Sequence, residues 1–171
     1  MESTIRQISK SAYVIIGPEG ATNFTIVKGS DGSAVLIDAD IRRIDEVEEA
    51  LRLTGCARVG YLIDTHEHFD HTSANFYFAQ KQIPIVASAG CVQAMQDDGT
   101  ADFARMLKPV PELYERFPGL CLTLPDVVFS SATQVKLPGV TLDLVYRAEN
   151  GHSHSKGDTT IYFHEEEVFI A

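Results

Sequence analysis

The chain has 171 residues, which is long enough for one domain with its own hydrophobic core. Its net charge is −10, from 24 acidic and 14 basic residues. This balance argues against nucleic acid as a partner, because phosphate binding draws on clustered Lys and Arg. No apolar run reaches the roughly 18 residues of a membrane span, and no secretory signal is visible. We therefore expect a cytoplasmic protein without a membrane partner.

The first half of the chain predicts an antiparallel meander followed by βαβ units. Residues 12–16, 23–28 and 34–38 are short runs rich in β-branched side chains, separated by glycine-containing turns. Residues 44–53 then carry apolar side chains at helical spacing. Residues 61–64 and 83–87 predict buried strands, and residues 72–82 predict a helix between them. This alternation indicates parallel strands joined by helices.

The second half predicts helix and loop over residues 91–120, as part of a pocket wall, and then four strands. These strands cover residues 127–137, 140–146, 159–164 and 168–171. Because there is no internal repeat and no low-complexity linker, we expect one domain over residues 1–171. The chain stops inside an apolar strand, so we also expect that its C-terminal part is missing. Uncovered apolar surface and an open strand edge would favour homo-oligomers.

The three cysteines, Cys56, Cys91 and Cys121, are odd in number and far apart. No C-x-x-C pair occurs, so neither a disulfide framework nor a cysteine zinc site is indicated. We expect each to be a small, partly buried thiol.

Five of the six histidines fall in two short clusters. The first cluster places His66, His68, Asp70 and His71 within six residues, directly after a predicted strand. Imidazole and carboxylate suit Zn²⁺, and also iron or manganese. Residues two apart in an extended loop point the same way, so His66 and His68 can share one metal. Asp70 and His71 follow the turn into a helix and can face a second metal nearby.

The second cluster, His152 and His154, lies in a glycine-containing segment between two predicted strands. The glycines allow tight backbone turns there. We expect one member of the pair to be a metal ligand. For His152 an exposed or supporting position is the expectation.

These motifs resemble those of the metallo-β-lactamase superfamily. The signature is His66-x-His68-x-Asp70-His71, the later motif is His154-Ser155-x-Gly157-Asp158, and Leu36-Ile37-Asp38-Ala39 resembles the early strand of the family. The resemblance runs from about Tyr13 to the last residue. It implies an α/β (α+β) fold, a four-layer αβ/βα sandwich of two sheets with helices on both outer faces.

The resemblance also implies a ligand set. His66, His68 and His154 would hold a first zinc, whereas Asp70 and His71 would hold a second. In the family the second metal also takes an aspartate after the last strand and a further histidine, and neither position lies within these 171 residues. Asp38 would support the site without binding metal. Asp38, Asp64 and Asp158 are candidates to hold the imidazole tautomers.

Three histidines leave an open zinc position in which the pKa of water falls from 15.7 to about 7. We therefore expect a zinc-dependent hydrolase that acts on a small ester, lactam, lactone or thioester, with Asp70 as the catalytic residue. The separation of 83 positions from His71 to His154 resembles the lactamase-like branch more than the glyoxalase II type. One alternative is an iron-dependent oxidoreductase, similar to persulfide dioxygenase. Another is an inactive metal-binding fragment.

Overall fold

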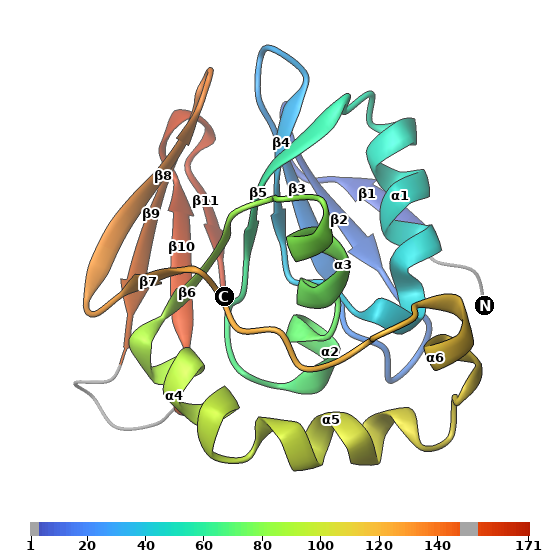
Figure 1. Cartoon of the computed structure of the whole chain (residues 1–171). Helices are drawn as coiled ribbons and strands as arrows, with labels where there is room; N and C mark the ends of the chain where they lie inside the picture. The colour runs from blue at the N-terminus through green and yellow to red at the C-terminus, as the bar shows by residue number, and fades with distance from the viewer. Residues whose placement is uncertain (1–3, 148–153) are drawn as a thin grey trace.

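Two β-sheets face each other, and helices cover the other face of the larger sheet (Figure 1). The structure is a computed structural model that describes residues 4–147 and 154–171. The larger sheet has seven strands in the order β1-β2-β3-β4-β5-β6-β7, and the smaller has four in the order β11-β10-β9-β8. The predicted mixed fold of two sheets and helices is confirmed.

The strands of the larger sheet are β1 (Thr4–Gln7), β2 (Ala12–Ile16), β3 (Phe24–Lys28), β4 (Ser33–Ile37), β5 (Arg58–Ile63), β6 (Ile85–Ser88) and β7 (Val127–Phe129). Those of the smaller sheet are β8 (Ala132–Leu137), β9 (Val140–Tyr146), β10 (Thr159–Phe163) and β11 (Val168–Ile170). The helices are α1 (Ile44–Leu53), α2 (Phe69–Thr72), α3 (Asn75–Gln80), α4 (Ala89–Asp97), α5 (Gly99–Leu107) and α6 (Glu112–Arg116). Within the described ranges, none of the helices is long and apolar enough to span a membrane.

The predicted meander and βαβ units are both present. Strands β2, β3 and β4 pair antiparallel, whereas β4, β5 and β6 pair parallel, with helices in the crossovers. The structure adds the edge strand β1, which the sequence pattern did not predict. Its four residues include a single apolar side chain, Ile5, so the alternation that marks a strand is too short to detect.

The helix predicted over residues 72–82 is instead two short helices, α2 and α3. Between them, the Ser73 hydroxyl accepts a hydrogen bond from the backbone N–H of Ile41 (3.0 Å). The N–H of Ala74 donates to the carbonyl of Ala39 (3.2 Å). Polar groups of Ser73 and Ala74 therefore bind the loop after β4, and the helix is interrupted at these two residues.

The strand predicted over residues 127–137 also divides into two. Its first part, β7, pairs parallel with β6 in the larger sheet, and its second part, β8, pairs antiparallel with β9 in the smaller sheet. The chain thus passes from one sheet to the other at residues 130–131. An apolar pattern reports burial but not which sheet a strand joins, so the sequence could not show this crossing.

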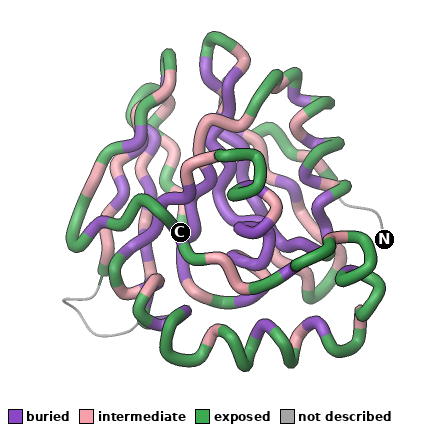
Figure 2. The backbone as a smooth tube through the Cα atoms, viewed as in Figure 1, coloured by how far each residue is buried: buried purple, intermediate pink, exposed green. Residues whose placement is uncertain are grey.

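The larger sheet is buried on both faces. In β4, Val35 and Ile37 pack against the smaller sheet, whereas Ala34 and Leu36 pack against the layer of α1 and α3. This two-sided burial accounts for a strand without an exposed residue. Figure 2 shows the buried residues gathered along the central strands. The sheet is consequently a firm base for the loops at its edge.

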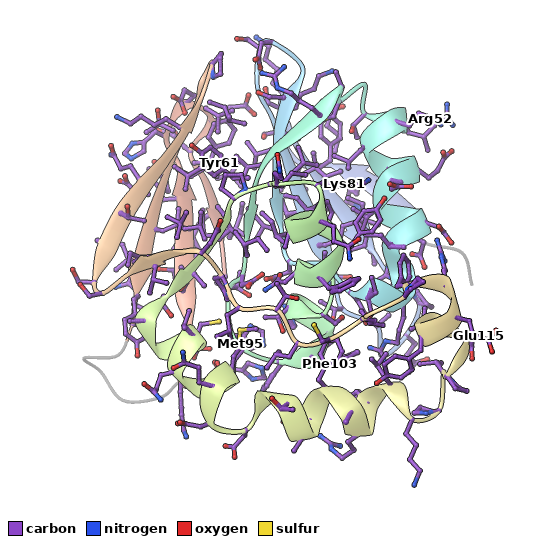
Figure 3. All side chains as sticks on the ribbon, in the orientation of Figure 1. Arg52, Tyr61, Lys81, Met95, Phe103 and Glu115 are labelled. Atoms are coloured by element: carbon purple, nitrogen blue, oxygen red, sulfur yellow. The ribbon has the colours of Figure 1, made fainter. Side chains whose placement is uncertain are left out.

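A third apolar cluster attaches α5 and α6 to the start of α2. Phe69, the first residue of α2, packs edge-to-face on Phe103 of α5 with ring centroids 5.3 Å apart. Figure 3 labels Phe103 on α5 and Met95 on α4, where these helices pass below the sheets. This contact places α5 beside the histidine-containing loop.

The cysteines differ in exposure, which yields a chemical test of the fold. Cys91 is 0% exposed, and burial raises the pKa of its thiol well above the ordinary value. Cys121 is exposed, contrary to the expectation of a partly buried thiol, and it lies in a segment, residues 120–125, without helix or strand. A short pulse of iodoacetamide at pH 8 should therefore modify Cys121 and leave Cys91 unmodified, as read by mass spectrometry.

Two controls accompany this labelling. Cys121→Ser should remove the fast modification, and guanidinium should make Cys91 reactive. Rapid modification of Cys91 in the folded protein would contradict its place in the core.

Candidate metal centre

The predicted ligands gather at one end of the two sheets. Strands β4 and β5 run parallel, so the segments that follow them lie side by side at their carboxyl ends. The loop after β5 carries His66 and His68 and leads into α2, which carries Asp70 and His71. His154 comes from the segment before β10, in the smaller sheet. His152 lies outside the described residues.

Three imidazoles converge on one point. The Nε2 atoms of His66 and His154 each lie 3.1 Å from Nδ1 of His68. One ring nitrogen from each histidine lies within 4.8 Å of the others. Zinc–nitrogen bonds of about 2.0–2.1 Å at tetrahedral angles would place ligand nitrogens about 3.3 Å apart. Both the donor type and the spacing therefore fit a single divalent ion.

Asp70 and His71 lie beside this cluster and not within it. The rings of His66 and His71 have centroids 3.9 Å apart. Nε2 of His71 is 3.7 Å from Oδ2 of Asp70. The side chains therefore form a three-histidine group and, beside it, an Asp–His pair, as predicted. A second metal ion bound by Asp70 and His71 stays a prediction.

The carboxylate of Asp38 holds two of these rings in place. Its Oδ1 accepts the backbone N–H of Thr65 (2.8 Å), and its Oδ2 accepts the Thr65 hydroxyl (2.8 Å). Nδ1 of His71 lies 2.9 Å from Oδ2, and the Thr65 hydroxyl lies 3.0 Å from Nδ1 of His66. With Nδ1 occupied in both rings, each Nε2 is left as the ligating atom. The supporting position predicted for Asp38 is observed, while Thr65 was not predicted.

The backbone of Asp38 adopts a left-handed conformation, with φ of 61°. Non-glycine residues are uncommon there, although Asp tolerates the region better than most. The residue is 6% exposed, and both of its carboxylate oxygens take part in the contacts above. The strained turn is thus compensated by the hydrogen bonds that its carboxylate makes.

The pKa shifts of His66 and Asp70 suit the binding of a cation, whereas that of His71 favours its protonated form. Burial, together with the nearby His71, lowers the pKa of His66 to about 4, although the charge of Asp38 opposes this. Burial acts to lower the pKa of His71, but its hydrogen bond to Asp38 and the charges of Asp38 and Asp70 raise it overall. Burial acts to raise the pKa of Asp70, but the hydrogen bond from Thr22 and the charge of His71 lower it overall. At neutral pH His66 is neutral and Asp70 is ionised, which are the forms that bind metal.

The segment that carries His154 is shaped by Asp158. Its carboxylate accepts the backbone N–H of His154 (2.7 Å) and of Ser155 (3.1 Å), and the Ser155 hydroxyl (2.8 Å). These bonds close a tight turn around the histidine. Asp158 therefore positions His154 through its backbone, in place of the predicted contact with an imidazole.

Glu67 and Gly157 join this turn to the first histidine loop. Oε2 of Glu67 accepts the N–H of Gly157 (3.0 Å), and Oε1 accepts the N–H of Lys156 (3.1 Å). A Cβ at position 157 would lie 2.6 Å from Cα of Cys91, so no side chain fits there. Glu67 lies between His66 and His68 in the sequence, and its position gave no signal of this contact. Glu67 thus holds the two histidine motifs together, and the sequence pattern of neither motif predicted this role.

Thr22 connects Asp70 to the loop between β2 and β3. Its hydroxyl donates to Oδ2 of Asp70, and its carbonyl accepts a hydrogen bond from Nη1 of Arg43. Arg43 is 8% exposed and also pairs with Glu46. The buried Arg43 therefore holds the loop that bears Thr22 in place through a hydrogen bond to its backbone.

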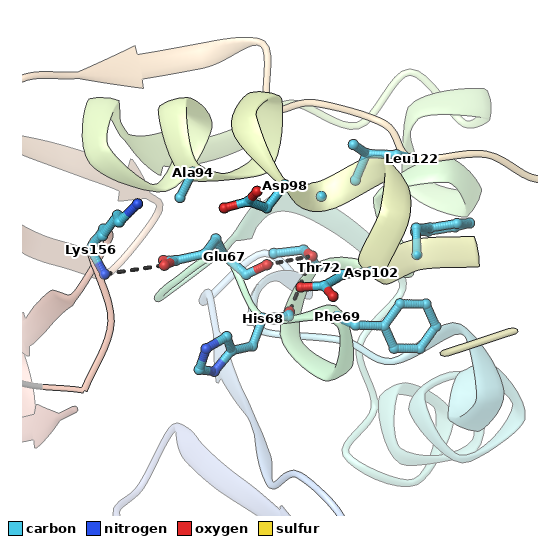
Figure 4. A pocket seen from close by; sticks show the side chains of 11 residues that line it. Glu67, His68, Phe69, Thr72, Ala94, Asp98, Asp102, Leu122 and Lys156 are labelled. Atoms are coloured by element: carbon cyan, nitrogen blue, oxygen red, sulfur yellow. Dashed lines mark hydrogen bonds between the residues drawn. The ribbon is translucent and has the colours of Figure 1, made fainter. Parts of the chain in front are cut away.

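Two hollows adjoin the histidines. The larger, about 730 Å³, is lined by His66, His71 and His154 together with the β2–β3 loop and the ends of β10 and β11. The smaller, about 140 Å³, is lined by His68 together with residues of α4 and α5. Figure 4 shows it with Glu67 directed toward Lys156. The segment 91–120 lines the smaller hollow, in agreement with its predicted place in a pocket wall, and contributes nothing to the larger one.

Asp64 does not contact an imidazole, contrary to its predicted supporting position. It is 0% exposed, and burial raises the pKa of its carboxyl group well above the ordinary value. Nδ2 of Asn75 donates to its Oδ2 (2.7 Å) and also to the carbonyl of Thr123 (3.2 Å). The pair thus ties the start of the histidine loop to α3.

This pair predicts a measurable coupling. Asn75→Leu should lower the free energy of unfolding by about 1–3 kcal/mol, because Asp64 stays buried without that donor. Urea denaturation of Asn75→Leu, Asp64→Leu and the double variant would measure it. The double variant should lose less than the sum of the two single variants. Strict additivity would show that the two side chains do not act as a pair.

Comparison with known proteins identifies relatives of this arrangement. Residues 17–171 match the family model described as the metallo-beta-lactamase superfamily. No curated protein sequence matched the chain. The fold is similar to that of a metallo-beta-lactamase from Pontibacter korlensis, with a TM-score of 0.69 and 17% identity over 94% of this chain and 66% of that one.

Two further structures give the same result. The FEZ-1 metallo-beta-lactamase from Legionella gormanii has a TM-score of 0.67 and 17% identity, over 94% of this chain and 59% of that one. The DIM-1 metallo-beta-lactamase has a TM-score of 0.68 and 12% identity, over 95% of this chain and 65% of that one. At this identity the likeness concerns the fold. The chain spans less than two thirds of the length of these structures.

Proposed function

The chain belongs to the metallo-β-lactamase superfamily, and on this basis we propose that it is a zinc-dependent hydrolase of small molecules with an ester, lactam, lactone or thioester bond. The observation that supports the proposal most is the convergence of three imidazole nitrogens from two different sheets. Histidines separated by 86 residues in the chain meet within hydrogen-bond distance. Ring nitrogens that converge in this way supply the donor set that a divalent cation takes.

In this proposal His66, His68 and His154 hold the ion, and three protein ligands leave a fourth position open. A bound zinc ion would activate water near neutral pH and polarise a substrate carbonyl. The chain's own contribution is to keep the ring nitrogens convergent. Thr65 orients His66, and Asp158 fixes the backbone of His154.

Asp70 is the proposed proton acceptor. Its lowered pKa keeps the carboxylate ionised at neutral pH. One oxygen, Oδ2, accepts the Thr22 hydroxyl, which ties the carboxylate to the loop between β2 and β3. The proton of the attacking water would pass to Asp70 and then to the leaving group. His71, beside Asp70, is the proposed partner of that carboxylate in holding a second ion.

The first test of the proposal concerns metal content. The wild-type chain should bind about one zinc ion tightly, and His68→Ala should lose it, because Nδ1 of His68 is the atom that both other histidines face. Elemental analysis after dialysis against a zinc buffer measures this. Repeating the analysis on protein purified without added zinc identifies the preferred ion, and iron in the wild type would favour the oxidoreductase alternative.

His164→Ala is the matched control for metal content. His164 directly follows β10 and pairs with Asp143, outside the three-histidine cluster. This variant should keep the zinc of the wild type. An equal zinc content in the wild type and in His68→Ala would show that His68 is not a zinc ligand.

The second test concerns Asp70. With zinc loaded, Asp70→Asn should lower kcat on an activated ester or thioester by about 100-fold or more, because the amide cannot accept the proton. The zinc held by the three histidines should persist. Parallel kinetics and metal counting measure both quantities. Asp45→Asn, an exposed substitution on α1, is the control and should leave kcat unchanged. Full activity in Asp70→Asn would exclude Asp70 from catalysis.

A further inference from the structure

The side chain between the first two histidines extends away from the converging ring nitrogens. In an extended segment, residues two apart share a side, and the residue between them faces the opposite side. His66 and His68 bring ring nitrogens to within 3.1 Å of each other. Glu67 reaches instead toward the backbone of Lys156 (Figure 4). Its carboxylate therefore lies outside the donor set of the proposed metal centre.

Both oxygens of this carboxylate bind the segment that carries His154. Oε1 of Glu67 accepts the N–H of Lys156 (3.1 Å), and Oε2 accepts the N–H of Gly157 (3.0 Å). Burial acts to raise the pKa of Glu67, but its hydrogen bonds lower it overall, so the carboxylate is ionised at neutral pH. Hydrogen bonds from backbone N–H groups to an ionised carboxylate are stronger than those to a neutral acceptor. Glu67 thus holds the chain firmly within three residues of a proposed ligand.

Other side chains fix the same segment to parts of the fold that carry no predicted ligand. The carbonyl of Lys156 accepts the hydroxyl of Tyr146 in β9 (3.0 Å). The carbonyl of Gly157 accepts the hydroxyl of Ser88 in β6 (2.8 Å). Among these contacts, that of Glu67 is the one that comes from the first histidine loop. It therefore sets where the segment lies relative to the other two proposed ligands.

A separate bond joins the two segments beyond the turn. The carbonyl of Thr65 accepts the N–H of Thr159 (2.9 Å), the first residue of β10. Loss of the Glu67 carboxylate would leave this bond in place. Strand β10 would stay docked beside the first histidine loop, while the turn that carries His154 would lose its fixed position.

We propose that Glu67 is a positioning residue of the metal centre, which holds His154 where its ring completes the site begun by His66 and His68. This inference rests on the three-histidine site of the proposed function. A ligand that is held in place before the ion arrives loses less conformational freedom on binding, so affinity for the ion depends on Glu67. Contacts that orient a ligand in this way typically change metal affinity by about 10–100-fold.

The zinc affinity of the full chain, measured by competition with a chromophoric chelator, tests the proposal. Glu67→Ala should weaken zinc binding by about 10–100-fold. Glu67→Gln keeps one acceptor oxygen, so its affinity should lie between those of Glu67→Ala and the wild type. Cobalt(II) gives a second readout, because its visible absorption is stronger with four ligands than with six. This absorption should weaken in Glu67→Ala as His154 leaves the ligand set.

A double-variant cycle with His154→Ala shows whether Glu67 acts through this ligand. Glu67→Ala should weaken zinc binding in the wild-type background and have no further effect once His154 is absent. A carboxylate that attracted the cation by its charge alone would contribute equally in both backgrounds. Equal effects of Glu67→Ala in the two backgrounds would therefore overturn the proposal.

Hydrogen exchange of the metal-free chain tests the contact without any ion. Glu67→Ala should speed exchange of the N–H of Lys156, which loses its acceptor, and leave the N–H of Thr159 protected. Unchanged exchange at Lys156 would show that Glu67 does not hold this segment. Loss of protection at both positions would show a general loosening of the fold and would also overturn the positioning role.

Glu166→Ala is the matched control. Glu166 also accepts a backbone N–H from the other sheet's side of the molecule, that of Ser11 (2.9 Å), but it lies outside both histidine motifs. Its loss should lower the thermal stability and leave zinc affinity unchanged. A loss of zinc affinity as large as that of Glu67→Ala would show that any weakened contact of this kind has the same effect, which would contradict a specific role of Glu67.

The failure of this inference is distinguishable from that of the proposed function. Wild-type zinc affinity in Glu67→Ala, in a chain that hydrolyses esters or thioesters, would overturn the positioning role and keep the hydrolase assignment. Zinc affinity that depends on Glu67 through His154, in a chain that hydrolyses neither, would do the reverse.

Discussion

The site depends on the burial of one carboxylate, that of Asp38, at the end of a strand covered on both faces. A buried carboxylate is costly unless hydrogen-bond donors surround it. Thr65 and His71 supply those donors, from the loop that follows the neighbouring parallel strand. The carbonyl of Thr65 in turn accepts the backbone N–H of Thr159 (2.9 Å), the first residue of β10. The single charge of Asp38, at the carboxyl end of β4, thus organises contacts that reach the smaller sheet.

The surrounding architecture makes that organisation rigid. Apolar side chains cover the larger sheet on one face with the smaller sheet and on the other with α1 and α3. The loops that carry the histidines therefore emerge from a closely packed base, and the glycine at position 157 allows the second loop to approach α4 without an intervening side chain. Loops on such a base are well suited to hold side chains in fixed relative positions.

Sequence reasoning reached the parts of this structure that local pattern encodes. The meander, helix α1 and the histidine signature each lie within a short window, so periodicity and residue type were sufficient to predict them. Glu67, Thr22 and Asn75 were missed because their partners lie far away in the chain, and a polar residue in a loop gives no sign of what it contacts. The single helix predicted over residues 72–82 failed for a similar reason, since Ser73 bonds to the loop after β4.

The distance along the chain between His68 and His154 has a consequence for folding. The two histidines are 86 residues apart, and closing a flexible loop of that length costs about 4 kcal/mol of chain entropy, apart from a constant. His66 and His68 are neighbours in the unfolded chain, but His154 joins them only after β10 has docked beside the loop at Thr65. The three-nitrogen cluster is therefore complete only when the two sheets have come together in the correct register.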